Sequence, residues 1–125
     1  MTASPQSVRL ARVAARAASA KLARDPVAFD VSQRLALADV FLIVSAGNER
    51  QVGAVADGIQ EALLAGGFKP RGSEGVGEGR WVLLDYLDVV VHVQHDEERA
   101  TYGLEQLWKD CPVIDLPADA PAATG

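Results

Sequence analysis

At 125 residues, with 49% hydrophobic and 23% charged side chains, the chain has the composition of one globular domain rather than of a disordered protein. Its net charge of −5 argues against a surface that neutralises nucleic-acid phosphates and favours a basic partner. A single cysteine, Cys111, excludes an internal disulfide, and no apolar run reaches the roughly 20 residues of a membrane-spanning helix. We therefore expect a cytoplasmic protein without a signal peptide or a membrane segment.

The first expected element is a helix over residues 5–24, because Pro5 suits a first helical turn and the stretch after it is rich in alanine. Asp25-Pro26 should end this helix, and residues 27–31 are expected to form a short strand. Three arginines at helical spacing give the helix a basic stripe, which we interpret as a solvated face: Arg9, Arg12 and Arg16.

The middle of the chain has the clearest pattern. Residues 40–46 are an apolar run too short for a helix, which is typical of a central strand buried on both sides. Asn48 predicts the N-cap of a helix over residues 49–65, with Gln51 completing a capping box, and Gly66-Gly67 should end it. We expect this helix to connect the strand to a parallel neighbour.

The second half of the chain predicts a β-hairpin. A short strand over residues 68–71 and a mobile glycine-rich loop over residues 72–79 should precede it. Residues 81–93 are dense in β-branched and aromatic side chains and predict two strands that turn near residues 86–88. Both faces of the hairpin are largely apolar, so we infer that helices cover one face and another protein covers the other.

A third helix should follow, with Asp96 as its cap and four residues on its apolar side: Ala100, Leu104, Leu107 and Trp108. Residues 1–112 would then form one α/β domain, a mixed sheet of about five strands flanked by helices. Residues 113–125, rich in alanine and proline, are expected to be a disordered tail.

Patterns for catalysis are weak. The glycine-rich loop leads into a strand and has no Lys-Ser or Lys-Thr after it, unlike a phosphate-binding loop. Asp85 and Asp88 offer an alternative function, a nucleotidyltransferase-like enzyme or nucleotide-binding protein that holds metal ions on both carboxylates, but the turn separates them. His92 and His95 should point to opposite faces of a strand, so we expect no metal site and no cofactor.

Aromatic residues concentrate in the hairpin and in the helix after it: Trp81, Tyr86, Tyr102 and Trp108. We expect Trp108 to lie in the core, since it shares the apolar side of the helix with Leu104. For Trp81 and Tyr86 both a core position and an interface position stay open, because interfaces also concentrate tryptophan and tyrosine.

These residues belong to a set that resembles the ribosomal silencing factor family, also called the Iojap-like family. The matching positions follow the order of the family: residues 30–32, 38–45, 47–52, 74–75, 81–86 and 90–93, then Arg99, Tyr102, Leu104, Glu105, Leu107 and Trp108. The chain departs from the family at Ala38, Asn48 and Gln94, the last of which stands where a bulky apolar residue is common.

The resemblance implies a fold related to nucleotidyltransferases without their active site, and a function without catalysis or cofactor. It implies a translational repressor that binds the large ribosomal subunit through its protein L-fourteen and sterically blocks joining of the small subunit. Little nucleic-acid contact, no membrane contact and a homodimer of the free protein are also implied. The residues expected to make the partner contacts are Trp81, Leu83, Asp85, Tyr86, His92, Arg99 and Tyr102.

Overall fold

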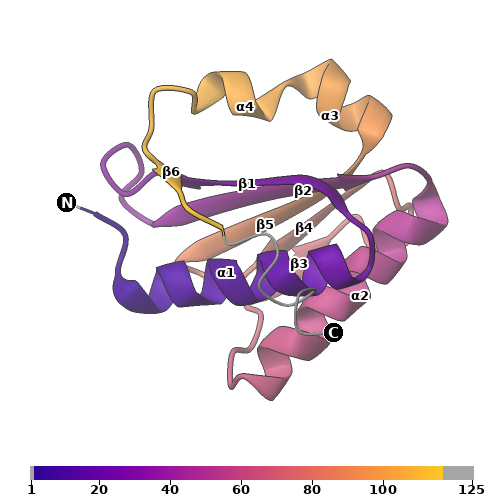
Figure 1. The fold of residues 1–125 in the computed structure, drawn as a ribbon, viewed down its shortest axis with the longest axis horizontal. Coiled ribbons are helices and arrows are strands. Elements are labelled where there is room, and N and C mark those ends of the chain that lie inside the picture. Colours follow the sequence, from indigo (N-terminus) through magenta and orange to yellow (C-terminus); the bar gives the residue numbers. More distant parts are fainter. Residues whose placement is uncertain (1, 117–125) are drawn as a thin grey trace.

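The structure, a computed structural model, describes residues 2–116 and has three layers (Figure 1). A six-stranded sheet lies between α1 and α2 on one face and α3 and α4 on the other. The α/β class is as expected, with six strands in place of about five. The elements are α1 (Pro5–Ala20), β1 (Arg24–Asp30), β2 (Val40–Ala46), α2 (Glu49–Ala65), β3 (Gly72–Glu74), β4 (Trp81–Asp85), β5 (Val89–His95), α3 (Asp96–Tyr102), α4 (Leu104–Leu107) and β6 (Val113–Ile114).

The strands lie in the order β3-β4-β5-β2-β1-β6. β2 and β5 are parallel neighbours, and every other pair is antiparallel. The predicted strand over residues 40–46 and its parallel connection through α2 are confirmed. β6 is a correction, because residues 113–116 were expected in a disordered tail and Val113 instead pairs with Phe29. Residues 117–125 lie outside the described part of the chain.

The larger core lies between the sheet and the helices α1 and α2. Alternate residues of β2 and β5 point into it, among them Leu42 and Val91, and meet the apolar sides of the two helices. Burial of each large aliphatic side chain here contributes about 1.5–3 kcal/mol to folding. The best predicted helix, α2, has Asn48 as its N-cap: Gln51 N donates to Asn48 Oδ1 at 2.9 Å. The expected capping box is not closed in its usual form, because Gln51 Oε1 accepts from Gly47 N at 3.4 Å rather than from the N-cap Asn48 N, while Gln51 Nε2 donates to Leu22 O at 3.2 Å.

The first helix ends earlier than the sequence suggested. Lys21 N and Leu22 N bond back to Ala18 O and Ser19 O, and Leu22 then adopts a φ of 68°. The chain can therefore enter β1 already at Arg24, and the Asp25-Pro26 pair falls inside the strand. Pairing with β2 shifts register between Arg24 and Val27, an irregularity that accommodates a proline without an N–H group.

The strand before the hairpin starts later than expected. Phe68 packs against the larger core, and residues 68–71 are not a strand. Pairing with β4 starts where Arg71 N donates to Asp85 O, and β3 then covers Gly72–Glu74, part of the expected loop. The hairpin of β4 and β5, with its turn at residues 86–88, is confirmed.

The third helix is broken. Gly103 adopts the left-handed conformation (φ 55°, ψ 45°) and separates α3 from α4, so the four expected apolar residues do not share one side. Ala100 and Leu107 are exposed. The N-cap is His95, whose Nδ1 accepts from Glu97 N at 3.1 Å, and not Asp96. Leu104 and Trp108 cover a smaller cluster on this face: Phe29, Val31, Ile43 and Cys111.

Candidate partner-binding surface

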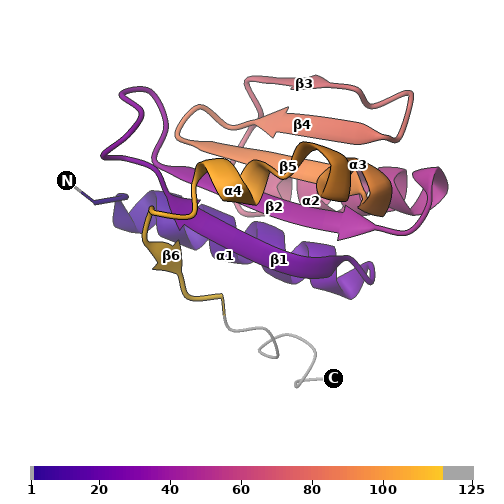
Figure 2. The same cartoon turned by 90° about the horizontal axis from the view of Figure 1, so that it is seen from above.

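The face of the sheet that carries α3 and α4 is only partly covered. Seen from above, the two helices lie over β5 and β2, and β4 lies beside them (Figure 2). Alternation along β4 sends Val82 and Leu84 into the larger core, where both are fully buried. Trp81, Leu83 and Asp85 point to the other face and are half-buried. Trp81 and Leu83 therefore form an apolar strip that the other elements of residues 2–116 cover only in part.

Five rings form a continuous row across this face, called here the aromatic row. Tyr102 of α3 lies 5.0 Å from Trp81 of β4, centroid to centroid, and Trp81 lies 6.0 Å from His92 of β5. Phe41 of β2 lies 5.2 Å from His92 and 5.1 Å from Trp108, with edge-on geometry at both contacts. Such pairs are favourable beyond their buried area and fix the orientation of each ring. Tyr102 is the most exposed ring of the row.

His92 supports the row from beneath. Trp81 Nε1 donates to His92 Nδ1 at 3.1 Å, which fixes the position of the indole. Burial lowers the pKa of His92 to about 4, so the ring is neutral near pH 7. Its Nε2 is buried and has no hydrogen-bond partner within the described residues. His92 therefore offers little surface of its own, and its role is to hold Trp81.

Tyr86 belongs to the core. It is 7% exposed and packs in the larger core, on the sheet face opposite to Trp81. Burial raises the pKa of its phenol, and the hydroxyl has no hydrogen-bond partner within the described residues. Of the two positions left open for Tyr86, the structure therefore favours the core, whereas Trp81 lies at the boundary between core and surface.

Arg99 points inward and joins four elements. Its guanidinium forms a two-pronged ion pair with Glu105 of α4, at 3.0 Å for each prong, which also lowers the pKa of the Glu105 carboxyl. It also donates to Ser45 Oγ of β2 at 3.1 Å and to the carbonyl oxygens of Arg24 and Asp25 in β1, at 3.2 and 2.7 Å. The side chain is only 11% exposed, so Arg99 positions α3 and α4 against the sheet.

Asp85 is engaged within the chain. Arg71 Nε and Nη2 donate to its Oδ2 at 3.2 and 2.9 Å, and Leu87 N donates to its Oδ1 at 2.8 Å. Burial acts to raise the pKa of Asp85, but these hydrogen bonds lower it below its ordinary value. Asp88 is exposed at the turn. Within residues 2–116, no group of three or more His, Cys, Asp and Glu side chains is arranged to hold a metal ion.

Two contributors did not stand out in the sequence. Phe41 lies within an apolar run, and only the parallel register of β2 with β5 shows that it faces His92. Arg80, next to Trp81, pairs with Glu49 of α2 and with Glu97 and Glu98 of α3 at 2.9–3.1 Å, and these bonds raise the pKa of its guanidinium. No local pattern signals either contact, because both depend on elements distant in sequence.

In the described part of the chain, no helix combines the length and the apolar character needed to cross a bilayer.

Comparison with known proteins gives consistent matches. Residues 4–124 match the family described as ribosomal silencing factor during starvation. The ribosomal silencing factor RsfS of Bacillus subtilis is 43% identical over 105 residues, which cover 84% of this chain and 89% of that protein. A crystal structure of a Bacillus halodurans protein superimposes with a TM-score of 0.76 at 38% identity, over 86% of this chain and 98% of the other. A Chromobacterium violaceum protein superimposes with a TM-score of 0.79 at 32% identity, over 90% of this chain and 95% of the other.

Proposed function

The chain belongs to the ribosomal silencing factor family, and we propose that it represses translation by binding the large ribosomal subunit through protein L-fourteen and blocking the small subunit. A ribosome-associated silencing role follows from the family, which is not known as a family of enzymes. The identity of the contacted protein, the steric mechanism, a cytoplasmic location and a homodimer of the free protein are parts of the proposal.

The observation that carries the proposal is the half-covered aromatic row. Trp81 is held by His92 from below and by Tyr102 from the side, so its ring is fixed before any partner arrives. Leu83 continues the apolar strip along β4. Fixed tryptophan and tyrosine side chains are the residues that most often dominate binding energy at protein interfaces, because little side-chain entropy remains to be lost.

Charge supports the choice of partner. The net charge of −5 favours encounter with a basic ribosomal protein and disfavours extensive contact with ribosomal RNA. For a nanomolar complex the binding free energy is about −12 kcal/mol, and a few anchors supply most of it. No chemical step is required: a folded domain bound at the subunit interface excludes the small subunit by its volume.

Sedimentation tests the function directly. Purified protein is added to separated ribosomal subunits, which are then allowed to join and are resolved on a density gradient. We expect the protein to travel with the large subunit alone and to reduce the fraction of joined ribosomes in proportion to its occupancy. Equal binding to the small subunit, or undiminished joining at full occupancy of the large subunit, contradicts the steric mechanism.

A pair of substitutions tests the surface. We expect Trp81→Ala to weaken binding to isolated L-fourteen by about 2 kcal/mol or more, because it removes the central anchor. Tyr86→Phe is the matched control, since it deletes only a buried hydroxyl on the opposite face of the sheet. Full binding by a folded Trp81→Ala variant, checked by circular dichroism, argues against this surface.

A further inference from the structure

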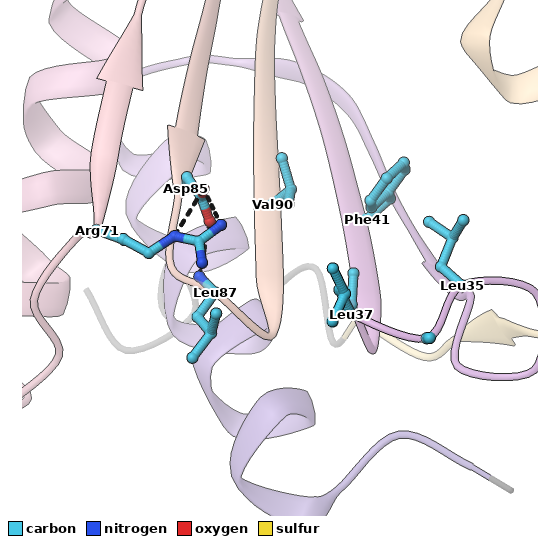
Figure 3. A pocket seen from close by; sticks show the side chains of 9 residues that line it. Leu35, Leu37, Phe41, Arg71, Asp85, Leu87 and Val90 are labelled. Atoms are coloured by element: carbon cyan, nitrogen blue, oxygen red, sulfur yellow. Dashed lines mark hydrogen bonds and ion pairs between the residues drawn. The ribbon is translucent and has the colours of Figure 1, made fainter.

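The partly covered face of the sheet, the one that carries α3 and α4, ends in an apolar groove beside the turn between β4 and β5 (Figure 3). The hairpin contributes Leu87 and Val90, and the segment before β2 contributes Leu35 and Leu37. Phe41 of β2 lies between Val90 and Leu35. The Arg71–Asp85 ion pair borders the groove on the side of β3 and β4. Since Phe41 also belongs to the aromatic row, the groove and the row form one continuous surface.

Two leucines of this groove gain little from the fold of the chain. Leu37 is 83% exposed and Leu87 is 49% exposed, so Leu37 buries little apolar area and Leu87 leaves about half of its area uncovered. Leu87 also adopts a φ of 72°, a conformation in which glycine or asparagine is favoured and leucine is strained. Exposure and backbone strain are both unfavourable within the chain, and Leu22 shares them; what distinguishes Leu87 is its place in an apolar groove, which favours a contact outside the chain.

The groove is formed before any ligand binds. Leu87 N is held by Asp85 Oδ1 at 2.8 Å, which fixes the turn. Asp88 O accepts from Asp39 N at 2.7 Å and from Val40 N at 3.1 Å, and these two bonds tie the turn to the segment that carries Leu37. A side chain that enters the groove therefore meets walls that need no ordering, which favours binding.

Charge at the rim indicates the chemistry of the occupant. The carboxylate of Asp85 is already matched by Arg71. Asp88, next to Leu87, is exposed, and within residues 2–116 it forms no ion pair. The turn that supplies Leu87 to the groove thus also carries one negative charge without an ion-pair partner, on a chain whose net charge is −5.

We propose that this groove receives an apolar side chain of the ribosomal partner protein, next to a lysine or arginine of the same partner that pairs with Asp88. Leu37 and Leu87 thereby extend the docking surface beyond the aromatic row. The inference rests on the proposed function and adds to it the residue chemistry that the partner must present.

Leu87→Gly separates binding from folding. Glycine accepts the positive φ without strain and removes the apolar side chain, so the thermal midpoint should stay constant or rise. The affinity for large subunits should fall about tenfold or more. Leu22→Gly is the matched control: Leu22 has a φ of 68° and 74% exposure, but it lies near the start of α2, beyond the other end of β2. Its thermal midpoint should likewise stay constant or rise, and its affinity for large subunits should be unchanged.

A charge substitution tests the second half of the proposal. Asp88→Asn should slow association with large subunits several-fold and flatten its dependence on salt, because it removes an attractive surface charge. Asp57→Asn, which removes an exposed carboxylate from α2, should change neither. An unchanged rate in Asp88→Asn overturns the basic side chain as occupant of the rim.

The possible results separate a failure of the groove proposal from a failure of the proposed function. If the wild-type protein binds large subunits and Leu87→Gly binds them equally well, the groove proposal is overturned and the proposed function stands. If Leu87→Gly instead abolishes self-association, measured by analytical ultracentrifugation, with unchanged subunit binding, the occupant is a second copy of this chain and the proposal is again overturned. If the wild-type protein binds no large subunits, the proposed function itself fails.

Discussion

The indole of Trp81 donates a hydrogen bond of 3.1 Å from Nε1 to Nδ1 of His92. An acceptor Nδ1 means that the neutral imidazole carries its proton on Nε2, since only one nitrogen of a neutral ring is protonated. A second proton on His92 would have to take the place of this bond, at a site where burial lowers its pKa to about 4. The fixed position of Trp81 is thus coupled to the charge of His92.

This coupling predicts a dependence of stability on pH. The pKa of His92 is depressed in the folded chain, to about 4 against an ordinary 6.5, so the unfolded chain binds the proton more readily. The stabilisation is fully present above about pH 6.5 and is lost as the pH falls toward 4. Between pH 7.5 and pH 5.0 we expect the free energy of unfolding, measured in urea, to fall by about 2 kcal/mol.

His92→Gln provides the control for that experiment, because the side-chain oxygen of glutamine can accept from Trp81 Nε1 but does not titrate. The ordinary pKa values of carboxylates lie below this pH window, so they contribute little to the difference. A loss of stability that is as large in His92→Gln as in the wild-type protein would assign the effect to other groups.

Arg99 and Arg71 both form two hydrogen bonds to a carboxylate, yet we expect different consequences when each is removed. Arg99→Ala leaves Glu105 without its partner and ends the bonds to Ser45, β1 and α4, so it should lower the free energy of unfolding by about 3 kcal/mol. Arg71→Ala removes an ion pair whose arginine is 64% exposed, and Asp85 keeps its bond from Leu87 N, so the loss should be less than about 1 kcal/mol. Urea titration of both variants checks the ranking, and equal losses would show that Arg99 does not hold α3 and α4 against the sheet.

The difference between the two arginines illustrates what sequence alone can predict. β2, α2 and the hairpin could be anticipated because their signals are local: an apolar run, an N-cap and alternating branched residues. The inward position of Arg99 could not, since it depends on α3 returning over the start of β1. The break at Gly103 has a local signal, since glycine is the usual residue after the end of a helix, but the apolar residues on either side of it continue a helical spacing and concealed it.

The candidate surface was anticipated only in part. Trp81 and Tyr102 stood out by type and position, and their rings do meet on the face of the sheet that carries α3 and α4. Tyr86 stood out equally, but the pleat of β4 turns it to the opposite face, into the larger core. Leu37 and Leu87 did not stand out, because their significance lies in exposure and in a backbone angle, neither of which is visible in a sequence.

Replacing the buried Gln94 by an apolar residue should stabilise the protein. Its side chain is fully buried on β5, and neither atom of its amide has a hydrogen-bond partner within the described residues. We expect Gln94→Met, which has a similar length and no amide, to raise the free energy of unfolding by about 1–2 kcal/mol. Gln106→Met, at an exposed position of α4, should change it by less than about 0.5 kcal/mol. A loss of stability in Gln94→Met would show that the amide is satisfied in solution.

Substitution of Gly79 can distinguish two descriptions of the glycine-rich segment. It is either a mobile loop, as its composition suggested, or a loop packed in a fixed conformation against α2. Its φ is 68°, and a Cβ atom at this position would lie 2.8 Å from the carbonyl oxygen of Glu49, at the start of α2. Gly77 has neither constraint, since a Cβ atom there meets nothing within 4 Å. Glu49 also pairs with Arg80, so a displaced Gly79 would disturb the contact that joins α2 to β4.

We therefore expect Gly79→Ala to lower the free energy of unfolding by about 2 kcal/mol, from backbone strain and the close approach together. Gly77→Ala should be neutral or raise it by a few tenths of a kcal/mol, because alanine restricts the unfolded chain. Thermal unfolding of the two variants, with amide exchange at residues 75–80, separates the alternatives. Equal and small effects at both positions would mean that the segment moves freely and that Gly79 contributes nothing to the position of Trp81, two residues further on.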